Sequence, residues 1–281
     1  MRPAKTALGI DIGGTWVRIA RVTPAGETVA RSEAPTPPDG DPVLLSQLLA
    51  TQVQRIRPNA PAGDIAIGVA VPGIWDRQTG IMQRAVNLPR LEGRNIRQLF
   101  ADALGRPVFV ATDVNAAAWA QWRALCPPPQ RFVYISIGTG VGGGVILDGQ
   151  IVGHTHGGPG HLGHLVVDTA PDAPLCRCGC RGCLEALVSG PAIAGTAQLE
   201  RAARALAIGL QQLAVLYTPD VIALGGGVID HQSVLVDQTR LAWAQLRHGL
   251  APPALKIERA PLPADQAGVL GVAQMALDHT Q

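Results

Sequence analysis

Residues 108–118 read VFVATDVNAAA, and this stretch decides which fold the chain is expected to adopt. A β-branched apolar run stops at Asp113, and an alanine-rich segment follows at once. A strand that ends in an aspartate, with that aspartate as the N-cap of the next helix, places a carboxylate at the mouth of an α/β cleft. The sequence therefore predicts an α/β protein with Asp113 as a candidate catalytic base.

The rest of the chain alternates between strand and helix patterns. β-Branched apolar runs predict strands, and apolar residues at helical spacing predict helices. The other predicted strands cover residues 7–10, 16–22, 28–34, 65–71, 132–137, 145–147, 151–152, 221–224 and 255–259. The predicted helices cover residues 41–56, 95–104, 199–216, 234–246 and 266–277, and Asp41 is the expected N-cap of the first.

Both halves of the chain open with a strand, a glycine-rich turn and a hairpin. This parallel predicts two α/β lobes around a central cleft. We expect the first lobe to comprise residues 1–126, joined by the C-terminal helix at 265–281. The second lobe would comprise residues 127–264 and would contain a Gly-, His- and Cys-rich segment at 154–185.

Composition narrows the possible classes of protein. Of the 281 residues, 47% are hydrophobic and 16% are charged, so the chain can bury a large core. The net charge of +2 gives no basic surface for nucleic acid or membrane, and no apolar leader or membrane span precedes the first strand. We therefore expect a cytoplasmic protein, whose five cysteines are metal ligands or free thiols instead of disulfides.

Three glycine-rich turns are candidate nucleotide sites. Residues 11–15 read DIGGT, and glycines in such a turn let backbone N–H groups approach phosphate oxygens. Asp11 would orient Mg²⁺ and Thr15 would donate to the γ-phosphate; the alternative is an ordinary hairpin. Residues 138–144 read GTGVGGG, for which the alternative is a β-bulge, and residues 225–227 are glycines that could lie against an adenine. The predicted nucleotide-binding residues are Asp11, Gly13, Gly14, Thr15, Gly138, Thr139, Gly140, Gly142, Gly226 and Gly227.

Four cysteines lie within residues 176–183, CRCGCRGC, and His164 precedes them. Three thiolates and one imidazole are the ligand set of a tetrahedral structural zinc. The alternative is a group of reduced free thiols, and counting alone does not fix which three cysteines would bind. Four histidines fall at 154, 156, 161 and 164, which indicates polar recognition, with the first two peripheral.

Taken in order, these motifs resemble the ROK family of sugar kinases and sugar-responsive repressors. Residues 11–15 and 138–144 are similar to the two phosphate loops of the family, and residues 157–164, GGPGHLGH, to its sugar-binding segment. Residues 176–185, CRCGCRGCLE, resemble its zinc signature. The resemblance covers essentially the whole chain.

The resemblance implies an actin-like (ribonuclease H-like) ATPase fold with two lobes. It also implies that the protein uses ATP and Mg²⁺ and forms a homodimer. It implies that Asp113 acts as general base on a sugar 6-hydroxyl, and that a structural Zn²⁺ braces the sugar pocket. The implied zinc ligands are His164, Cys176, Cys178 and Cys183. The implied sugar-binding residues are Gly73, Asn87, Thr112, His161, His164 and Glu185.

Three positions depart from the usual family pattern. His161 replaces the usual glutamate, and Thr112 replaces the usual asparagine. The segment between Ser189 and Leu199 is shorter by about two short helices. Histidine at position 161 is similar to the branch that phosphorylates N-acetylmannosamine, so we expect this sugar as substrate, its 6-phosphate as product, and a place in sialic-acid catabolism. Glucose and N-acetylglucosamine are the alternative sugars.

Two other classes of function are less favoured. Family repressors carry a helix-turn-helix ahead of the first glycine turn, and a turn that begins at Asp11 leaves no room for one. A sugar sensor without catalysis would not need Asp113, Asp11 and Thr15 together.

Overall fold

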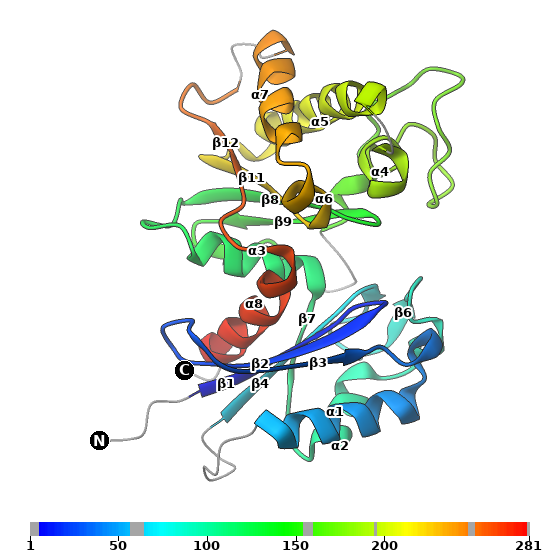
Figure 1. The fold of residues 1–281 in the computed structure, drawn as a ribbon, viewed down its shortest axis with the longest axis vertical. Helices are drawn as coiled ribbons and strands as arrows, with labels where there is room; N and C mark the ends of the chain where they lie inside the picture. Colours follow the sequence, from blue (N-terminus) through cyan, green and yellow to red (C-terminus); the bar gives the residue numbers. More distant parts are fainter. Residues whose placement is uncertain (1–5, 57–64, 154–159, 194–195, 247–250, 280–281) are drawn as a thin grey trace. The chain divides into compact units, whose positions relative to one another are not determined.

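The computed structural model describes residues 6–56, 65–153, 160–193, 196–246 and 251–279. The chain divides into two compact units, drawn in Figure 1. Unit 1 takes in Met1–Ala120, Gly153–Gly158 and Gln266–Gln281, and unit 2 takes in Gln121–Val152 and Pro159–Asp265. Among the described residues, no helix combines the length and the apolar character needed to cross a membrane.

Unit 1 is built on a five-stranded sheet in the order β3-β2-β1-β4-β7. Its strands are β1 (Thr6–Ile12), β2 (Trp16–Val22), β3 (Thr28–Pro35), β4 (Ile65–Val71) and β7 (Phe109–Thr112). β1, β2 and β3 pair antiparallel, whereas β1, β4 and β7 are parallel. Because the carboxyl ends of parallel strands share one edge of a sheet, Asp11 of β1 and Asp113, which follows β7, lie at the same edge.

Helices cover both faces of this sheet (Figure 1). On one face, α1 (Pro42–Ile56) and α2 (Ile96–Leu104) bury Leu45, Leu49 and Phe100 with the large aliphatic residues of β1 and β4. On the other face, α3 (Asp113–Arg123) and α8 (Ala264–His279) pack through small residues, with Ala116 and Val272 in one cluster with alanines of β4 and β7. Side-chain size therefore determines how closely each pair of helices approaches the sheet.

The approach of α8 depends on glycine. A Cβ atom on Gly9 of β1 would lie 2.0 Å from the Val269 carbonyl oxygen, and one on Gly271 would lie 1.7 Å from that of Ala116. Both distances are far below van der Waals contact, so the α8 backbone lies directly against β1 and α3.

The helix ends follow their sequence signals. The Oδ1 atom of Asp41 accepts the N–H groups of Val43 at 2.9 Å and Leu44 at 3.0 Å, which confirms the predicted N-cap of α1. α2 begins after Asn95, whose side chain accepts the Gln98 N–H, and it ends at Gly105 in the left-handed conformation.

Unit 2 repeats the same plan. Its sheet has the order β10-β9-β8-β11-β12, formed by β8 (Arg131–Ile137), β9 (Val141–Leu147), β10 (Gln150–Ile151), β11 (Val221–Gly225) and β12 (Lys256–Arg259). Again the first three strands in sequence pair antiparallel and the last two extend the first in parallel. α5 (Thr196–Tyr217) and α7 (Val234–Leu246) pack together over one face of this sheet (Figure 1).

The structure corrects three details of the sequence prediction. β9 begins at Val141, so Gly142 lies in a strand, paired with Ser136, and the second glycine turn is shorter than predicted. Glycine is needed in β9 because a Cβ on Gly143 would lie 2.2 Å from the Tyr134 carbonyl oxygen. The predicted N-cap at Asp113 is wrong by one residue, because Asp113 is already the first residue of α3. The hairpin of β5 (Ile74–Trp75) and β6 (Met82–Arg84) and the short helix α6 (Gly227–His231) were not predicted.

Candidate active site

Asp113 is a partly buried carboxylate at the start of α3. Its Oδ1 atom accepts the N–H of Val114 at 2.9 Å. The hydroxyl of Thr112 accepts the N–H of Asn115 at 3.4 Å, so Thr112 is the N-cap of α3. Burial raises the pKa of Asp113, and the hydrogen bond from Val114 opposes this rise only in part. A carboxylate with a raised pKa is a better proton acceptor than an exposed one.

Asp11 is the second carboxylate at this edge of the unit 1 sheet. Its pKa is raised to about 7, mainly by burial and then by the nearby charge of Asp113, while Arg18, opposite Asp11 on β2, acts to lower it. Its carboxylate lies against α8, since a Cβ on Gly268 would be 2.6 Å from Oδ2. Two neighbouring acidic groups at one edge offer the carboxylate oxygens that a divalent cation prefers as ligands.

Replacing Asp11 with asparagine should stabilise the protein in a pH-dependent way. The pKa rises from 3.8 unfolded to about 7 folded, so the penalty for burying the ionised group grows above pH 4 and is complete above pH 7. Because the side chain is only partly buried, we expect Asp11→Asn to gain about 2 kcal/mol at pH 8 and little at pH 4, without Mg²⁺. Urea unfolding at the two pH values measures this. The exposed Asp102→Asn is the control, and an equal gain at both pH values would contradict the prediction.

The first glycine turn is fixed by local hydrogen bonds. The N–H of Gly13 donates to the Trp16 carbonyl at 2.9 Å, and the hydroxyl of Thr36 donates to the Gly13 carbonyl at 2.7 Å. Gly14 and Thr15 are exposed at the tip of the turn. The turn is therefore held in place while its tip stays accessible to a ligand.

Two predicted sugar-binding residues also lie in unit 1. Asn87 lies against the first turn, because a Cβ on Gly14 would be 2.9 Å from the Asn87 Cβ. Gly73 has φ +121°, and a Cβ there would lie 2.4 Å from the Arg84 carbonyl oxygen. The structure thus brings Asn87 next to the predicted phosphate loop. The positive φ of residue 73 and the nearby Arg84 carbonyl explain why this residue is glycine.

The second glycine turn, residues 138–140, is held at both ends in unit 2. The Gly138 carbonyl accepts the N–H of Gly190 at 2.7 Å. At the other end, Oε2 of Glu185 accepts the N–H of Val141 at 2.9 Å. Thr139 and Gly140 are exposed between these two anchors.

The four predicted zinc ligands are close together in unit 2. The ligand atoms of His164, Cys176, Cys178 and Cys183 all lie within 4.8 Å of one another. His164 Nδ1 is 3.6 Å from Cys176 Sγ, and Cys178 Sγ is 3.6 Å from Cys183 Sγ. A tetrahedral zinc with Zn–S bonds of about 2.3 Å needs sulfurs roughly 3.8 Å apart, so this set fits the metal. Burial raises the pKa of the Cys183 thiol to about 12, so a metal that binds it must displace a proton.

His161 lies beside this cluster. Its ring stacks on that of His164, with centroids 5.9 Å apart, and the pKa of His161 is lowered by burial and by His164, with Glu185 opposing the shift. His161 is therefore a neutral hydrogen-bonding group near neutral pH. Residues 154–159, which include His154 and His156 of the predicted segment, lie outside the described residues.

The third glycine turn has a structural explanation. Gly226 has φ +92° at the start of α6, and a Cβ there would lie 2.4 Å from the Ile137 carbonyl oxygen. Gly227, in contrast, has open space around it. Close packing on β8 therefore accounts for Gly226 whether or not a nucleotide binds.

Sequence reasoning missed two residues that shape these turns. Thr36 lies on the chain after β3, where nothing in the sequence links it to Gly13. Gly190 lies in a Ser-Gly-Pro turn, which is a signal for a bend but gives no partner. Both act through contacts between distant segments.

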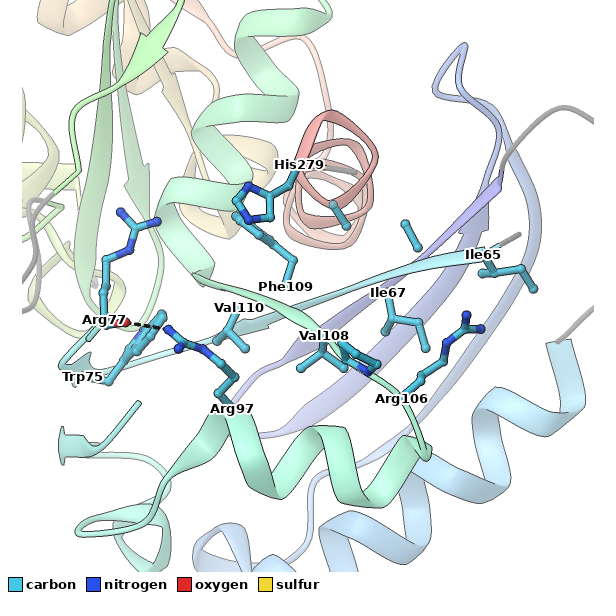
Figure 2. Close-up of a pocket in the computed structure, with 13 residues that line it drawn as sticks. Ile65, Ile67, Trp75, Arg77, Arg97, Arg106, Val108, Phe109, Val110 and His279 are labelled. Atoms are coloured by element: carbon cyan, nitrogen blue, oxygen red, sulfur yellow. Dashed lines mark hydrogen bonds between the residues drawn. The ribbon is translucent and has the colours of Figure 1, made fainter. Parts of the chain in front are cut away.

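Unit 1 also contains a cavity of about 710 Å³ beside the first residues of β7 (Figure 2). Arg77, Arg97 and Arg106 line it, together with Phe109 and His279, whose ring centroids are 5.2 Å apart. Its lining includes no residue predicted to bind sugar or nucleotide.

Comparison with known proteins assigns the class. The sequence profile of the ROK family matches residues 7–200 and 194–279, and the chain belongs to this family. The N-acetylmannosamine kinase of Citrobacter koseri is 37% identical over 193 residues, an alignment that covers 69% of this chain and 64% of that protein.

Solved structures agree with this assignment. The ROK hexokinase of Thermus thermophilus has a TM-score of 0.83 and 30% identity, with 98% of this chain and 99% of that chain covered. A ROK family glucokinase from Streptomyces griseus, solved with glucose and AMPPNP, has a TM-score of 0.80 at 24% identity and covers 97% and 99% of the two chains. The fold is therefore that of the ROK sugar kinases, an actin-like ATPase fold, as predicted.

Proposed function

We propose that this protein transfers the γ-phosphoryl group of MgATP to the 6-hydroxyl of N-acetylmannosamine. The observation that supports it most is the pair of partly buried carboxylates, Asp11 and Asp113, at the strand edge that also carries the first glycine turn. Asp113 would accept the proton of a sugar hydroxyl, and Asp11 would bind the Mg²⁺ that accompanies ATP.

Asp113 would orient the sugar hydroxyl and accept its proton as the O–P bond forms. Catalysis of phosphoryl transfer is mainly positioning and charge neutralisation, so a fixed carboxylate and fixed backbone donors suffice. The N–H groups at the exposed positions Gly14, Thr15, Thr139 and Gly140 would hold the phosphates, with Gly13, Gly138, Gly142, Gly226 and Gly227 in supporting positions. Mg²⁺, when bound through Asp11, would neutralise charge on the β- and γ-phosphates.

The proposed sugar contacts are Gly73, Asn87, Thr112, His161, His164 and Glu185. A structural zinc on Nδ1 of His164 would fix its tautomer and leave Nε2 free to bond a hydroxyl. The cytoplasm, which supplies ATP and keeps thiols reduced, is the proposed compartment, and a homodimer the proposed assembly.

The choice of N-acetylmannosamine rests on the relative at 37% identity and on His161. Glucose is the second candidate, because the structural neighbour at 30% identity over nearly the whole chain is a hexokinase. The two sugars differ at C2, where the acetamido group needs both a hydrogen-bonding partner and space.

A panel of sugars tests the proposal. With MgATP and N-acetylmannosamine, N-acetylglucosamine, glucose or mannose, ADP release gives kcat/KM for each. We expect N-acetylmannosamine to exceed glucose by roughly tenfold or more, the discrimination that one well-placed polar contact supplies. A preference for glucose would instead support the hexokinase function. If no sugar in the panel stimulates ADP release, the kinase proposal is rejected.

A further inference from the structure

We propose that Glu185 is a positioning residue that links the metal cluster to the second glycine turn. In this view the metal controls the geometry of the backbone donors that would hold the phosphates of ATP, in addition to that of the sugar pocket. The inference deepens the proposed kinase function and rests on it.

The side chain of Glu185 contacts both sites at once. Oε2 accepts the N–H of Val141 at 2.9 Å, and a Cβ on Gly140 would lie 2.8 Å from the same oxygen. Oε1 lies 3.8 Å from Sγ of Cys176, which is itself 3.6 Å from Nδ1 of His164. One carboxylate therefore spans the distance between a metal ligand and the end of the turn.

The backbone provides a second connection. Cys183, a metal ligand in the proposed set, is the N-cap of α4 (Leu184–Val188), and Glu185 is the second residue of that helix. Directly after α4, the N–H of Gly190 donates to the Gly138 carbonyl at 2.7 Å. A metal that holds Cys183 would thus hold α4, whose Glu185 bonds Val141, and with it the segment after α4, whose Gly190 bonds Gly138.

The hydrogen bond from Val141 is the sensitive part of this connection. A backbone N–H that donates to a carboxylate forms a charge-assisted bond, which is stronger than a neutral one. The carboxylate can reach it only because Gly140 has no side chain in the way. Loss of the bond would loosen the Val141 end of the turn, where Thr139 and Gly140 are exposed and the 2.9 Å hydrogen bond from the Gly138 N–H to the Gly140 carbonyl remains.

This role is separable from a sugar contact. Substitution of a residue that contacts only the sugar lowers the affinity for sugar. It leaves the affinity for ATP, measured without sugar, unchanged. Substitution of a positioning residue changes the exchange rate of the Val141 amide proton, and it changes the affinity for an ATP analogue even when no sugar is present.

The experiment compares wild type, Glu185→Ala and Glu185→Gln. Glu200→Ala is the control, since Glu200 is exposed on α5 and pairs with Arg204 in its own helix. Hydrogen exchange of the peptide that contains Val141, metal content and titration with AMPPNP without sugar are measured on each. We expect Glu185→Ala to keep its metal, to speed exchange at Val141 and to weaken AMPPNP by about tenfold or more, as the loss of a hydrogen bond to a charged group implies. Glu185→Gln, whose carbonyl oxygen can still accept, should retain most of both properties.

Chelation of the metal gives the second arm. In wild type it should speed Val141 exchange as the alanine variant does, and in Glu185→Ala it should add little, because the connection is already broken. Unchanged exchange in Glu185→Ala, an equal effect of chelation in both proteins, or a wild type without metal would overturn the inference. If wild type binds no AMPPNP, the proposed function fails, while the exchange measurements still decide whether Glu185 couples the metal to the turn.

Discussion

Asp113→Asn is expected to lower kcat by about 100-fold or more, the contribution of a general base. Asparagine has the same shape and its Oδ1 can keep the 2.9 Å hydrogen bond from Val114, so α3 should begin as before. What is lost is the charge and the ability to accept a proton. AMPPNP affinity should therefore stay close to wild type, and the free energy of unfolding should not fall, because burial already penalises the ionised form of Asp113. Initial rates at saturating ATP and sugar measure the effect.

The matched control is Asp102→Asn, an equivalent change on the exposed face of α2 in the same unit. It should leave kcat unchanged. If Asp113→Asn kept kcat within roughly threefold of wild type, well short of the loss expected for a general base, Asp113 would not be that base.

Gly271→Ala should prevent the first unit from folding normally. The added Cβ would lie 1.7 Å from the Ala116 carbonyl oxygen, so α8 would have to move away from α3 and from the sheet. Backbone atoms cannot shift as a side-chain end can, and we expect a loss of more than about 4 kcal/mol, the range of the most damaging single substitutions. Yield of folded protein and urea unfolding give the measurement.

Gly209→Ala is the control, because Gly209 also lies inside a helix, α5. Its Cβ would lie 3.2 Å from Leu184 Cδ2 and in ordinary contact with Leu184 Cδ1 and Val167 Cγ1, at 3.6 and 3.7 Å, all of them side-chain ends that can shift. Alanine also favours the helix by about 1 kcal/mol. We expect stability within about 1 kcal/mol of wild type. Equal stability of the two variants would show that α8 does not need the close contact at Gly271.

Much of the fold follows from local sequence. The strands at 16–22 and 65–71 and the helix at 234–246 have the bounds that their patterns predicted, because each pattern is uninterrupted and bounded by turn residues. The shared plan of the two sheets followed from the matching strand, turn and hairpin at the start of each half.

The remaining features depend on contacts between distant segments. Gly142 and Gly143 looked like part of a turn, but they lie in β9, where η4 (Leu162–His164) and Tyr134 leave no room for a side chain at 143. The bond between Glu185 and Val141 joins residues 44 apart in sequence. Neither position carries a local signal that names its partner.

The candidate site also contains some residues that the sequence predicts and others whose role only the folded structure shows. Asp11, Asp113 and a His/Cys cluster that could bind a metal were predictable from residue type and spacing. The choice of His164, Cys176, Cys178 and Cys183 as the predicted ligands came from the resemblance to the ROK family. That Thr112 caps α3 and that Thr36 holds the first turn depends on hydrogen bonds that only the folded chain shows.

The position of the phosphate on the product tests the central claim most directly. The protein is incubated with MgATP and N-acetylmannosamine, and phosphorus–proton correlation NMR identifies the carbon that bears the new ester. Coupling of phosphorus to the two C6 protons is the predicted result, and with Asp113→Asn this signal should build up about 100-fold more slowly. A phosphate on another carbon, or ADP formed without a sugar phosphate, would contradict the claim that Asp113 directs the 6-hydroxyl to ATP.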